Sequence, residues 1–278
     1  MGLRGAVTSP RRAAVLGRPI EHSLSPVVHR AAYAALGLDW CYTSIDCGVA
    51  ELPAVLADRA DWAGFSCTMP LKHAVLDVAA QVAPIARAVG AANTLLPGER
   101  GWVAENTDAA GIVDALGEHE VVPQSVTLLG AGGTAQATLA ALLALGLDRC
   151  SVLVRDPARA GPLLATAQRL GVHVSLGPLD VAGDQLAADL VVSTLPAGAA
   201  DALARRDWTA AQTVLDVVYA GWPTPLAAAA SGGGASVVSG ALVLLHQAAA
   251  QVSLMTAQDA PVSAMRTALA SAAPGCDV

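Results

Sequence analysis

Residues 125–146 read SVTLLGAGGTAQATLAALLALG: a short apolar run, a glycine-rich turn and a long segment of alanine and leucine. The run at 125–129 predicts a buried strand, since short apolar runs bounded by turn residues are typical of parallel sheets. The segment at 134–145 predicts a helix that ends at Gly146, because glycine commonly closes helices. A strand, a tight turn and a helix in this order form the unit from which doubly wound α/β domains are built.

The turn has the spacing of a dinucleotide-binding site. Gly130 permits a tight turn, Gly132 lets a pyrophosphate approach the backbone, and an alanine at 135 lets the helix pack closely on the sheet. The start of the helix offers free N–H groups and the positive end of its dipole to phosphates. Because the motif follows a predicted strand and precedes a predicted helix, we expect a cofactor site rather than an ordinary loop. The residues that match G-x-G-x-x-A are Gly130, Ala131, Gly132, Gly133, Thr134 and Ala135.

The end of the next strand bears on which dinucleotide binds. A predicted strand at 151–154 is followed by Arg155, and Arg159 lies one helical turn further on. Arginine accommodates a ribose 2′-phosphate, so this pair favours NADP unless both side chains are simply solvated. Asp156 is the contrary sign, because an acid at this position binds the free 2′-hydroxyl of NAD. NAD therefore stays possible.

The same alternation of elements extends in both directions from this unit. Short apolar runs predict further strands at 13–16, 41–45, 64–67, 190–193 and 214–217. Helices are predicted at 29–36, 52–60 and 70–80, and a last one from Gly240 is long enough to leave the nucleotide domain. We expect an α/β protein with two domains, an N-terminal α/β domain and a doubly wound nucleotide domain.

The composition argues against several classes of partner. The net charge is −7, and charged residues make up only 14%, which does not suit nucleic acid or anionic membranes. The uncharged stretches at 121–147 and 217–258 (apart from His246) contain proline and glycine, which predicts buried strand–turn–helix units rather than membrane spans. The five cysteines lack the spacing of metal ligands, so we expect no metal and a reducing, cytoplasmic location.

Further motifs occur in order along nearly the whole chain. Residues 17–29 read GRPIEHSLSPVVH, similar to G-x-P-I-x-H-S-x-S-P-x-x-H, and residues 64–72 read GFSCTMPLK, similar to G-x-N-V-T-x-P-x-K. The others are GAANTL at 90–95, NTD at 106–108 with Gly111, DVVY at 216–219 with TPL at 224–226, and Gly240 with QAA at 247–249. Together they resemble the motifs of the shikimate dehydrogenase family.

The resemblance implies an NADP(H)-dependent oxidoreductase that interconverts 3-dehydroshikimate and shikimate, a step of aromatic amino-acid biosynthesis. It implies a substrate domain at 1–108, an NADP-binding domain at 109–241 and C-terminal helices at 242–278 that return to the substrate domain. The active site would lie in the cleft between the domains. The expected partner is the small-molecule substrate, without nucleic acid or membrane, for a chain that is a monomer or a homodimer.

Lys72 and Asp108 resemble the catalytic pair of the family. Hydride transfer to a ketone leaves negative charge on its oxygen, and lysine can deliver a proton there or stabilise the charge. An adjacent aspartate would orient the lysine and favour its charged form. The resemblance assigns substrate binding to Ser23, Ser25, Thr68, Asn93, Asp108, Tyr219 and Gln247, and cofactor binding to the glycine-rich turn with Arg155, Arg159, Thr194, Val217 and Gly240.

Several of these residues have a structural alternative. Ser25 could cap the helix that follows Pro26. Asn93 and Gln247 could bond backbone groups across the cleft, and Tyr219 could simply pack. His22 and His29 are interpreted as helix-entry and packing residues, because the proline between them prevents one helix from carrying both.

Six residues in four motifs depart from the family pattern, and these departures leave two alternatives open. Asp156 motivates the first, a quinate/shikimate dehydrogenase that uses NAD. The altered cofactor loop motivates the second, a dinucleotide-binding sensor without turnover. The departures are Ser66 for Asn, Ala135-Gln136 for Ser-Arg, Val154 and Asp156 within the N-R-T string, and Val243 for Met.

Overall fold

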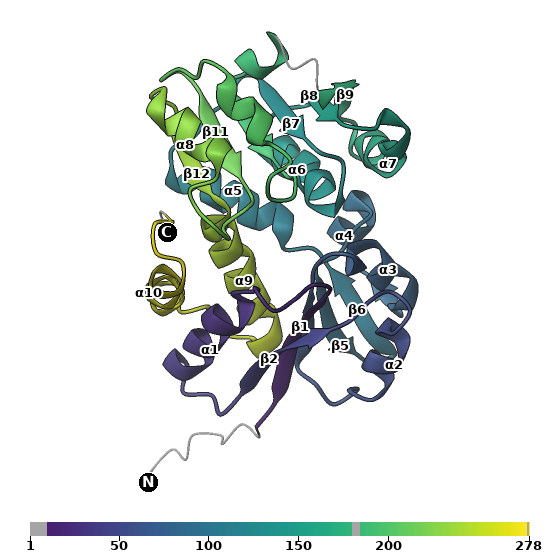
Figure 1. Cartoon of the computed structure of the whole chain (residues 1–278). Helices are drawn as coiled ribbons and strands as arrows, with labels where there is room; N and C mark the ends of the chain where they lie inside the picture. The colour runs from purple at the N-terminus through teal and green to yellow at the C-terminus, as the bar shows by residue number, and fades with distance from the viewer. Residues whose placement is uncertain (1–9, 180–183, 277) are drawn as a thin grey trace.

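In the computed structural model, which describes residues 10–179, 184–276 and 278, the chain forms two lobes, each built on a six-stranded sheet (Figure 1). The strands of the first sheet are β1 (Arg12–Gly17), β2 (Cys41–Asp46), β3 (Gly64–Cys67), β4 (Gln81–Val82), β5 (Thr94–Gly98) and β6 (Gly101–Glu105). Those of the second are β7 (Val126–Leu129), β8 (Arg149–Val154), β9 (His173–Pro178), β10 (Leu190–Ser193), β11 (Thr213–Asp216) and β12 (Ser236–Ser239).

The second sheet is parallel throughout and has the order β12-β11-β10-β7-β8-β9. The chain starts in the middle at β7, moves outward to β9, and then returns to build the other half from β10. This is the strand order of dinucleotide-binding folds, with the crevice at the carboxyl ends where the direction reverses. Its helices are α6 (Gly133–Ala144), α7 (Gly161–Leu170) and α8 (Pro225–Gly232). The predicted α/β fold with a doubly wound domain is confirmed.

The first sheet is mixed, with the order β2-β1-β3-β5-β6-β4. β1 pairs in parallel with β2 and β3, whereas β5 runs antiparallel to both β3 and β6. The helices of this lobe are α1 (Ser25–Ala35), α2 (Leu52–Ala57), α3 (Leu71–Val78) and α4 (Pro84–Val89). The loop at Thr68 and Met69 connects the carboxyl end of β3 to the start of α3.

Two helices join the lobes: α5 (Asp108–Glu118) and α9 (Gly240–Thr256) pack against each other. α9 starts directly after β12 in one lobe and continues into the other, where α1 and α10 (Val262–Ala272) pack beside it (Figure 1). Ile112 of α5 and Leu245 of α9 are fully buried in a core cluster that also holds Val15 of β1 and Leu128 of β7. The lobes thus share apolar packing along this pair of helices.

The uncharged stretches form buried strand and helix units as predicted: β7 with α6 in the first, and α8, β12 and α9 in the second, which follows β11. Within the described ranges, none of the helices has the length and apolar character to cross a membrane.

Several predicted bounds differ from those of the structure. α1 begins at Ser25 rather than at 29, because the fixed φ of Pro26 suits the first turn of a helix. α2 ends at Ala57, before the predicted 60, and β11 lies one residue earlier than predicted. The β5–β6 hairpin carries no sustained apolar run and contains Pro97, so periodicity did not predict it.

Candidate active site

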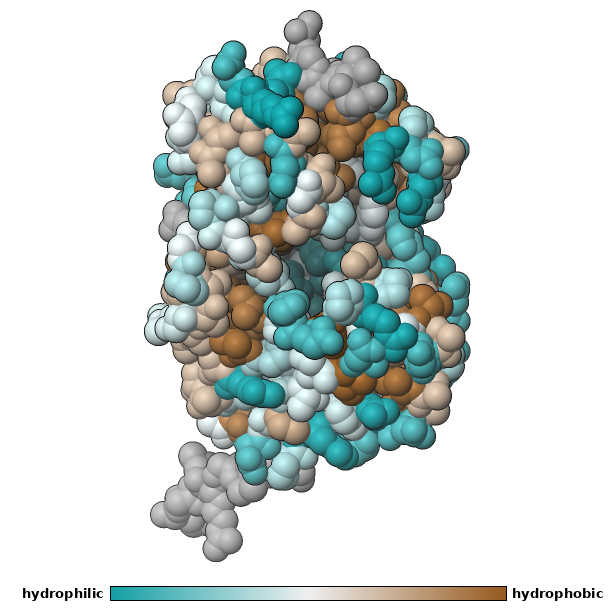
Figure 2. Space-filling model, in the orientation of Figure 1, coloured by the Kyte–Doolittle hydropathy of each residue, from teal (hydrophilic) through white to brown (hydrophobic). Residues whose placement is uncertain are grey.

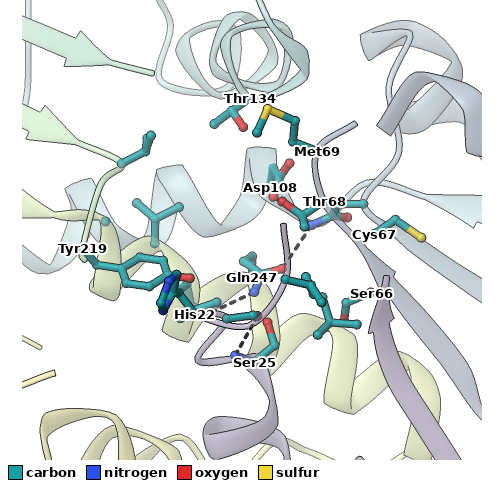
Figure 3. Close-up of a pocket in the computed structure, with 18 of the residues that line it drawn as sticks. His22, Ser25, Ser66, Cys67, Thr68, Met69, Asp108, Thr134, Tyr219 and Gln247 are labelled. Atoms are coloured by element: carbon teal, nitrogen blue, oxygen red, sulfur yellow. Dashed lines mark hydrogen bonds between the residues drawn. The ribbon is translucent and has the colours of Figure 1, made fainter. Parts of the chain in front are cut away.

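A cavity of about 450 Å³ lies between the two lobes. Figure 2 shows the surface hollowed at this level. Its walls come from the loop before α1, the end of β3, the starts of α3, α5 and α6, the segment after β11, and α9. In Figure 3, Thr134 approaches from the nucleotide-binding lobe, Ser25 lies on the opposite side, and Tyr219 and Ser66 lie at either end. All seven predicted substrate-binding residues, together with Lys72, line this cavity.

Lys72 and Asp108 form an ion pair in the cavity wall, with 2.6 Å between Nζ and Oδ2. The two side chains are only 15% and 9% exposed. Asp108 is the first residue of α5, where the helix dipole favours a carboxylate. The ammonium group of Lys72 also donates to Oγ1 of Thr134, at 3.0 Å. Two of its three N–H groups are therefore held by protein, and the third is available to a ligand.

Asn93 links this ion pair to α9. Its Nδ2 donates to Oδ1 of Asp108 at 2.8 Å and to Oε1 of Gln247 at 3.1 Å. Its Oδ1 accepts the backbone N–H of Thr107, which fixes the orientation of the amide. Gln247 in turn donates to the carbonyl oxygen of Leu244, in the preceding turn of α9. Both amides are thus structural and pocket-lining at once, so the alternatives left by the sequence are not exclusive.

The serine motif lies where α1 begins. Ser25 is the buried first residue of the helix, and its backbone N–H donates to Oγ of Ser23 at 3.3 Å. The structure gives no side-chain cap to the N-cap residue, Leu24, so Ser25 does not cap the helix. His29, one turn along, is buried, donates from Nδ1 to the carbonyl oxygen of Ser25, and stacks on Tyr42, as expected of a packing residue. His22, in contrast, is exposed and lines the cavity.

Tyr219 is half-buried and lines the cavity on the side of the serine motif. Burial raises the pKa of its phenol, so the hydroxyl stays protonated and can donate to a ligand.

The glycine-rich turn has room for phosphates. Gly130 has φ +104°, and a Cβ there would stand 2.6 Å from Oγ1 of Thr194, so only glycine fits. A Cβ on Gly132 would meet no atom within 4 Å, which leaves its backbone open to a ligand. Ala135 is fully buried at the start of α6, in agreement with the close helix–sheet packing expected. The residues present therefore fit a pyrophosphate at the N-terminus of α6.

The other predicted cofactor residues divide between the cavity and the surface. Val217 and Gly240 line the cavity side by side, because a Cβ on Gly240 would collide with the Val217 carbonyl group. Arg155 and Arg159 are exposed beyond the end of β8. Oδ1 of Asp156 accepts the backbone N–H of Ala158 at 3.0 Å and so caps the short turn of helix at Pro157–Arg159. This structural use of Asp156 weakens the argument for a 2′-hydroxyl ligand.

Two polar residues that matter in the structure were not predicted. Gln251 of α9 lines the cavity and lies one helical turn after Gln247, a spacing that could have indicated a shared face. Gln136, at a position where the family pattern has arginine, is buried. Its Nε2 donates to Oγ1 of Thr166 and to the carbonyl oxygen of Val89, across the two lobes.

Known proteins with a similar sequence match most of the chain. The model of the shikimate dehydrogenase substrate binding domain matches residues 15–95, and that of the shikimate 5'-dehydrogenase C-terminal domain matches residues 240–270. The chain is 38% identical over 270 residues to shikimate dehydrogenase (NADP(+)) of Anaeromyxobacter sp., covering 94% of this chain and 95% of the relative.

Solved structures agree with this result. Shikimate dehydrogenase of Mycobacterium tuberculosis is similar with a TM-score of 0.83 and 43% identity, covering 94% of this chain and 99% of that one. Shikimate 5-dehydrogenase of Thermus thermophilus, solved in complex with NADP(H) and shikimate, has a TM-score of 0.81 and 33% identity, with coverage of 94% and 99%.

Proposed function

Because the chain belongs to the shikimate dehydrogenase family, we propose that it catalyses the NADP(H)-linked interconversion of 3-dehydroshikimate and shikimate. The observation that carries the proposal is the Lys72–Asp108 ion pair, which lies in the cavity wall and contacts Thr134 of the glycine-rich turn. Lys72 thus lies between the proposed substrate site and the proposed dinucleotide site.

In the proposed reaction NADPH supplies the hydride that reduces the ketone. Lys72 donates a hydrogen bond to the ketone oxygen as negative charge develops there, and holds the proton that the product hydroxyl needs. Asp108 orients the ammonium group through the ion pair between Nζ and Oδ2, at 2.6 Å. Ser23 and Ser25 bind the substrate carboxylate. The ring hydroxyls form hydrogen bonds with polar groups of the cavity wall, and a ligand without those hydroxyls would bind less well because it would leave these groups unpaired. Those groups belong to Thr68, Asn93, Asp108, Tyr219 and Gln247.

The cofactor is held by the glycine-rich turn together with Thr194, Val217 and Gly240. Arg155 and Arg159 bind the 2′-phosphate, which makes NADP the preferred dinucleotide. Residues 1–108 and 242–278 form the substrate-binding part and residues 109–241 the NADP-binding part. The chain acts in the cytoplasm as a monomer or homodimer without nucleic acid; free thiols at all five cysteines support a reducing compartment.

The proposal is tested by following the absorbance of reduced nicotinamide with shikimate and with quinate, each with NADP and with NAD. Rapid reduction of NADP that depends on shikimate is the expected result. A preference for NAD or quinate would move the assignment to the NAD-using enzyme that Asp156 suggested. Folded protein that binds NADP but reduces neither dinucleotide would refute the proposal in favour of the sensor.

A further inference from the structure

Hydrogen bonds link three buried polar side chains in a chain from strand β2 through strand β3 to helix α9. The hydroxyl of Tyr42 and Oγ of Ser66 are 2.6 Å apart, and Oγ of Ser66 is 2.6 Å from Oε1 of Gln251. Tyr42 and Gln251 are 0% exposed and Ser66 is 5% exposed. Strand β1 lies between β2, which carries Tyr42, and β3, which carries Ser66. The residue of β1 that pairs with Tyr42 is the small Ala13, so the tyrosine side chain can extend across β1 to Ser66. Ser66 and Gln251 both line the cavity.

A backbone carbonyl group determines which atom donates in each of these hydrogen bonds. Nε2 of Gln251 lies 3.1 Å from the carbonyl oxygen of Asn93, which can only accept, so the amide group must point its NH₂ there. Its second hydrogen goes to Oγ1 of Thr94, at 2.9 Å. Thr94 accepts that bond and gives its own proton to Oδ1 of Asn93. Oδ1 is an acceptor in its turn, because the backbone N–H of Thr107 donates to it.

This orientation leaves Oε1 of Gln251 facing Ser66, so the hydroxyl of Ser66 must donate its only proton to Gln251. Tyr42 then donates to Ser66. Burial raises the pKa of Tyr42 well above its ordinary value, so its phenol retains the proton for this bond. Oγ of Ser66 therefore has one lone pair left, which can accept a hydrogen bond from a ligand in the cavity.

We propose that Gln251 and Tyr42 are positioning residues that make Ser66 purely a hydrogen-bond acceptor, so that this wall of the cavity selects a ligand group that donates. The neighbouring Gln247 has the opposite character. Its Oε1 is held by Asn93 and one N–H by Leu244, which leaves an N–H donor for the ligand. The cavity therefore distinguishes a donating from an accepting group at two defined places. The inference rests on the proposed function, since ring hydroxyls of shikimate are the donors that Ser66 would receive.

The test uses shikimate analogues in which each non-reacting ring hydroxyl is replaced in turn by fluorine or methoxy, groups that accept but cannot donate. For the wild-type protein, one of these positions should show a roughly 10- to 100-fold lower kcat/KM than shikimate, because Ser66 is left facing an acceptor. In Gln251→Leu the serine proton is free to turn to the ligand, so the ratio between shikimate and that analogue should shrink to a few-fold.

Gln212→Leu is the matched control, because it also removes a buried amide that donates to backbone carbonyls, those of Leu186 and Ala188 in the other lobe. It should keep the wild-type ratio. Tyr42→Phe should lower kcat/KM but also keep the ratio, since Gln251 still takes the serine proton. Ser66→Ala should bring the ratio close to one, and it carries the test if Gln251→Leu does not fold.

Equal discrimination in wild type and Gln251→Leu, or none in wild type that turns over shikimate, would overturn the inference and leave the proposed function intact. Absence of shikimate turnover in wild type would instead refute the proposed function itself.

Discussion

Gly111 of α5 and Gln247 of α9 lie so close that a Cβ on Gly111 would stand 2.8 Å from both the backbone nitrogen and the Cβ of Gln247. The absence of a side chain at 111 lets the two helices that join the lobes pack backbone to side chain. It also fixes the place of the amide group that Asn93 holds in the cavity wall.

We therefore expect Gly111→Ala to push α9 away from α5, lowering the free energy of unfolding by about 1–3 kcal/mol and raising KM for shikimate. Gly117→Ala, in the same helix, is the control. Its Cβ would meet nothing within 4 Å, and replacing a helical glycine should stabilise by about 0.5–1 kcal/mol. Chemical denaturation and steady-state kinetics compare the two variants. Equal behaviour would show that the close contact at 111 does not matter.

Lys72→Ala should lower kcat by roughly a hundredfold to ten-thousandfold, the usual contribution of a group that acts on the reacting oxygen. Binding of NADP, followed by fluorescence titration, should change little, because the turn loses only the hydrogen bond from Lys72 to Oγ1 of Thr134 and keeps its backbone N–H groups. A variant with wild-type kcat would remove Lys72 from the proposed chemistry.

Chemical modification offers a second approach to the same residue, because Lys72 is the only lysine of the chain. An amine-selective acylating reagent should inactivate the protein in proportion to modification at 72, measured by mass spectrometry of peptides. Shikimate and NADP together should protect it. Full activity of protein acylated at 72 would argue against an essential ammonium group.

Arg159→Ala should raise KM for NADP roughly 10- to 100-fold and leave that for NAD nearly unchanged, since a charge-assisted hydrogen bond to phosphate is removed. Arg149→Ala is a suitable control, because Arg149 is an exposed arginine at the opposite end of β8 and pairs only with Asp148 among the described residues. If Arg159→Ala affects both dinucleotides equally, the 2′-phosphate is held elsewhere.

His29 should make folding sensitive to acid. Burial lowers the pKa of His29 from its ordinary value of 6.5 to about 4, so the folded chain keeps it neutral where the unfolded chain binds a proton. Its contribution to stability is therefore complete above pH 6.5 and is lost as the pH falls toward 4, by on the order of 3 kcal/mol.

Denaturation midpoints between pH 7 and 4 measure this effect in wild type and in His29→Gln, which cannot titrate but retains a donor. The variant should lose less stability over this window. His173→Gln, which replaces an exposed histidine, should follow the wild type. Parallel profiles for all three proteins would mean that His29 accepts a proton in the folded state at little cost.

The sequence predicted the α/β class and the doubly wound domain because both depend on local patterns: apolar runs of strand length and a glycine-rich turn between strand and helix. It also brought Lys72, Asp108 and Asn93 forward as candidates, since each stands in a short, distinctive motif. The structure places the three within hydrogen-bonding distance of one another along one chain of contacts. Their roles stay predictions.

Local sequence patterns could not predict the hydrogen bond between Ser66 and Gln251 in the cavity wall. Ser66 and Gln251 are 185 residues apart in sequence, and a glutamine in an alanine-rich helix gives no sign of which partner it meets. Ser66 looked only like a shorter replacement for asparagine. Likewise Gln136 was noted only as a departure from the family's arginine, whereas its amide donates to carbonyl and hydroxyl groups that only tertiary packing brings to it.

The order of the elements along the chain, with α9 after the last strand of both sheets, has a consequence for synthesis. Both sheets are complete by Ser239, yet the amide groups of Gln247 and Gln251 that finish the cavity follow only afterwards. At about 5–20 residues per second, Gln251 follows Ser239 by on the order of a second, so synthesis passes through a brief stage in which the strands of both sheets exist but the pocket is unfinished. A ligand can stabilise only the form that binds it, so shikimate can assist folding only once α9 has been synthesised and has packed.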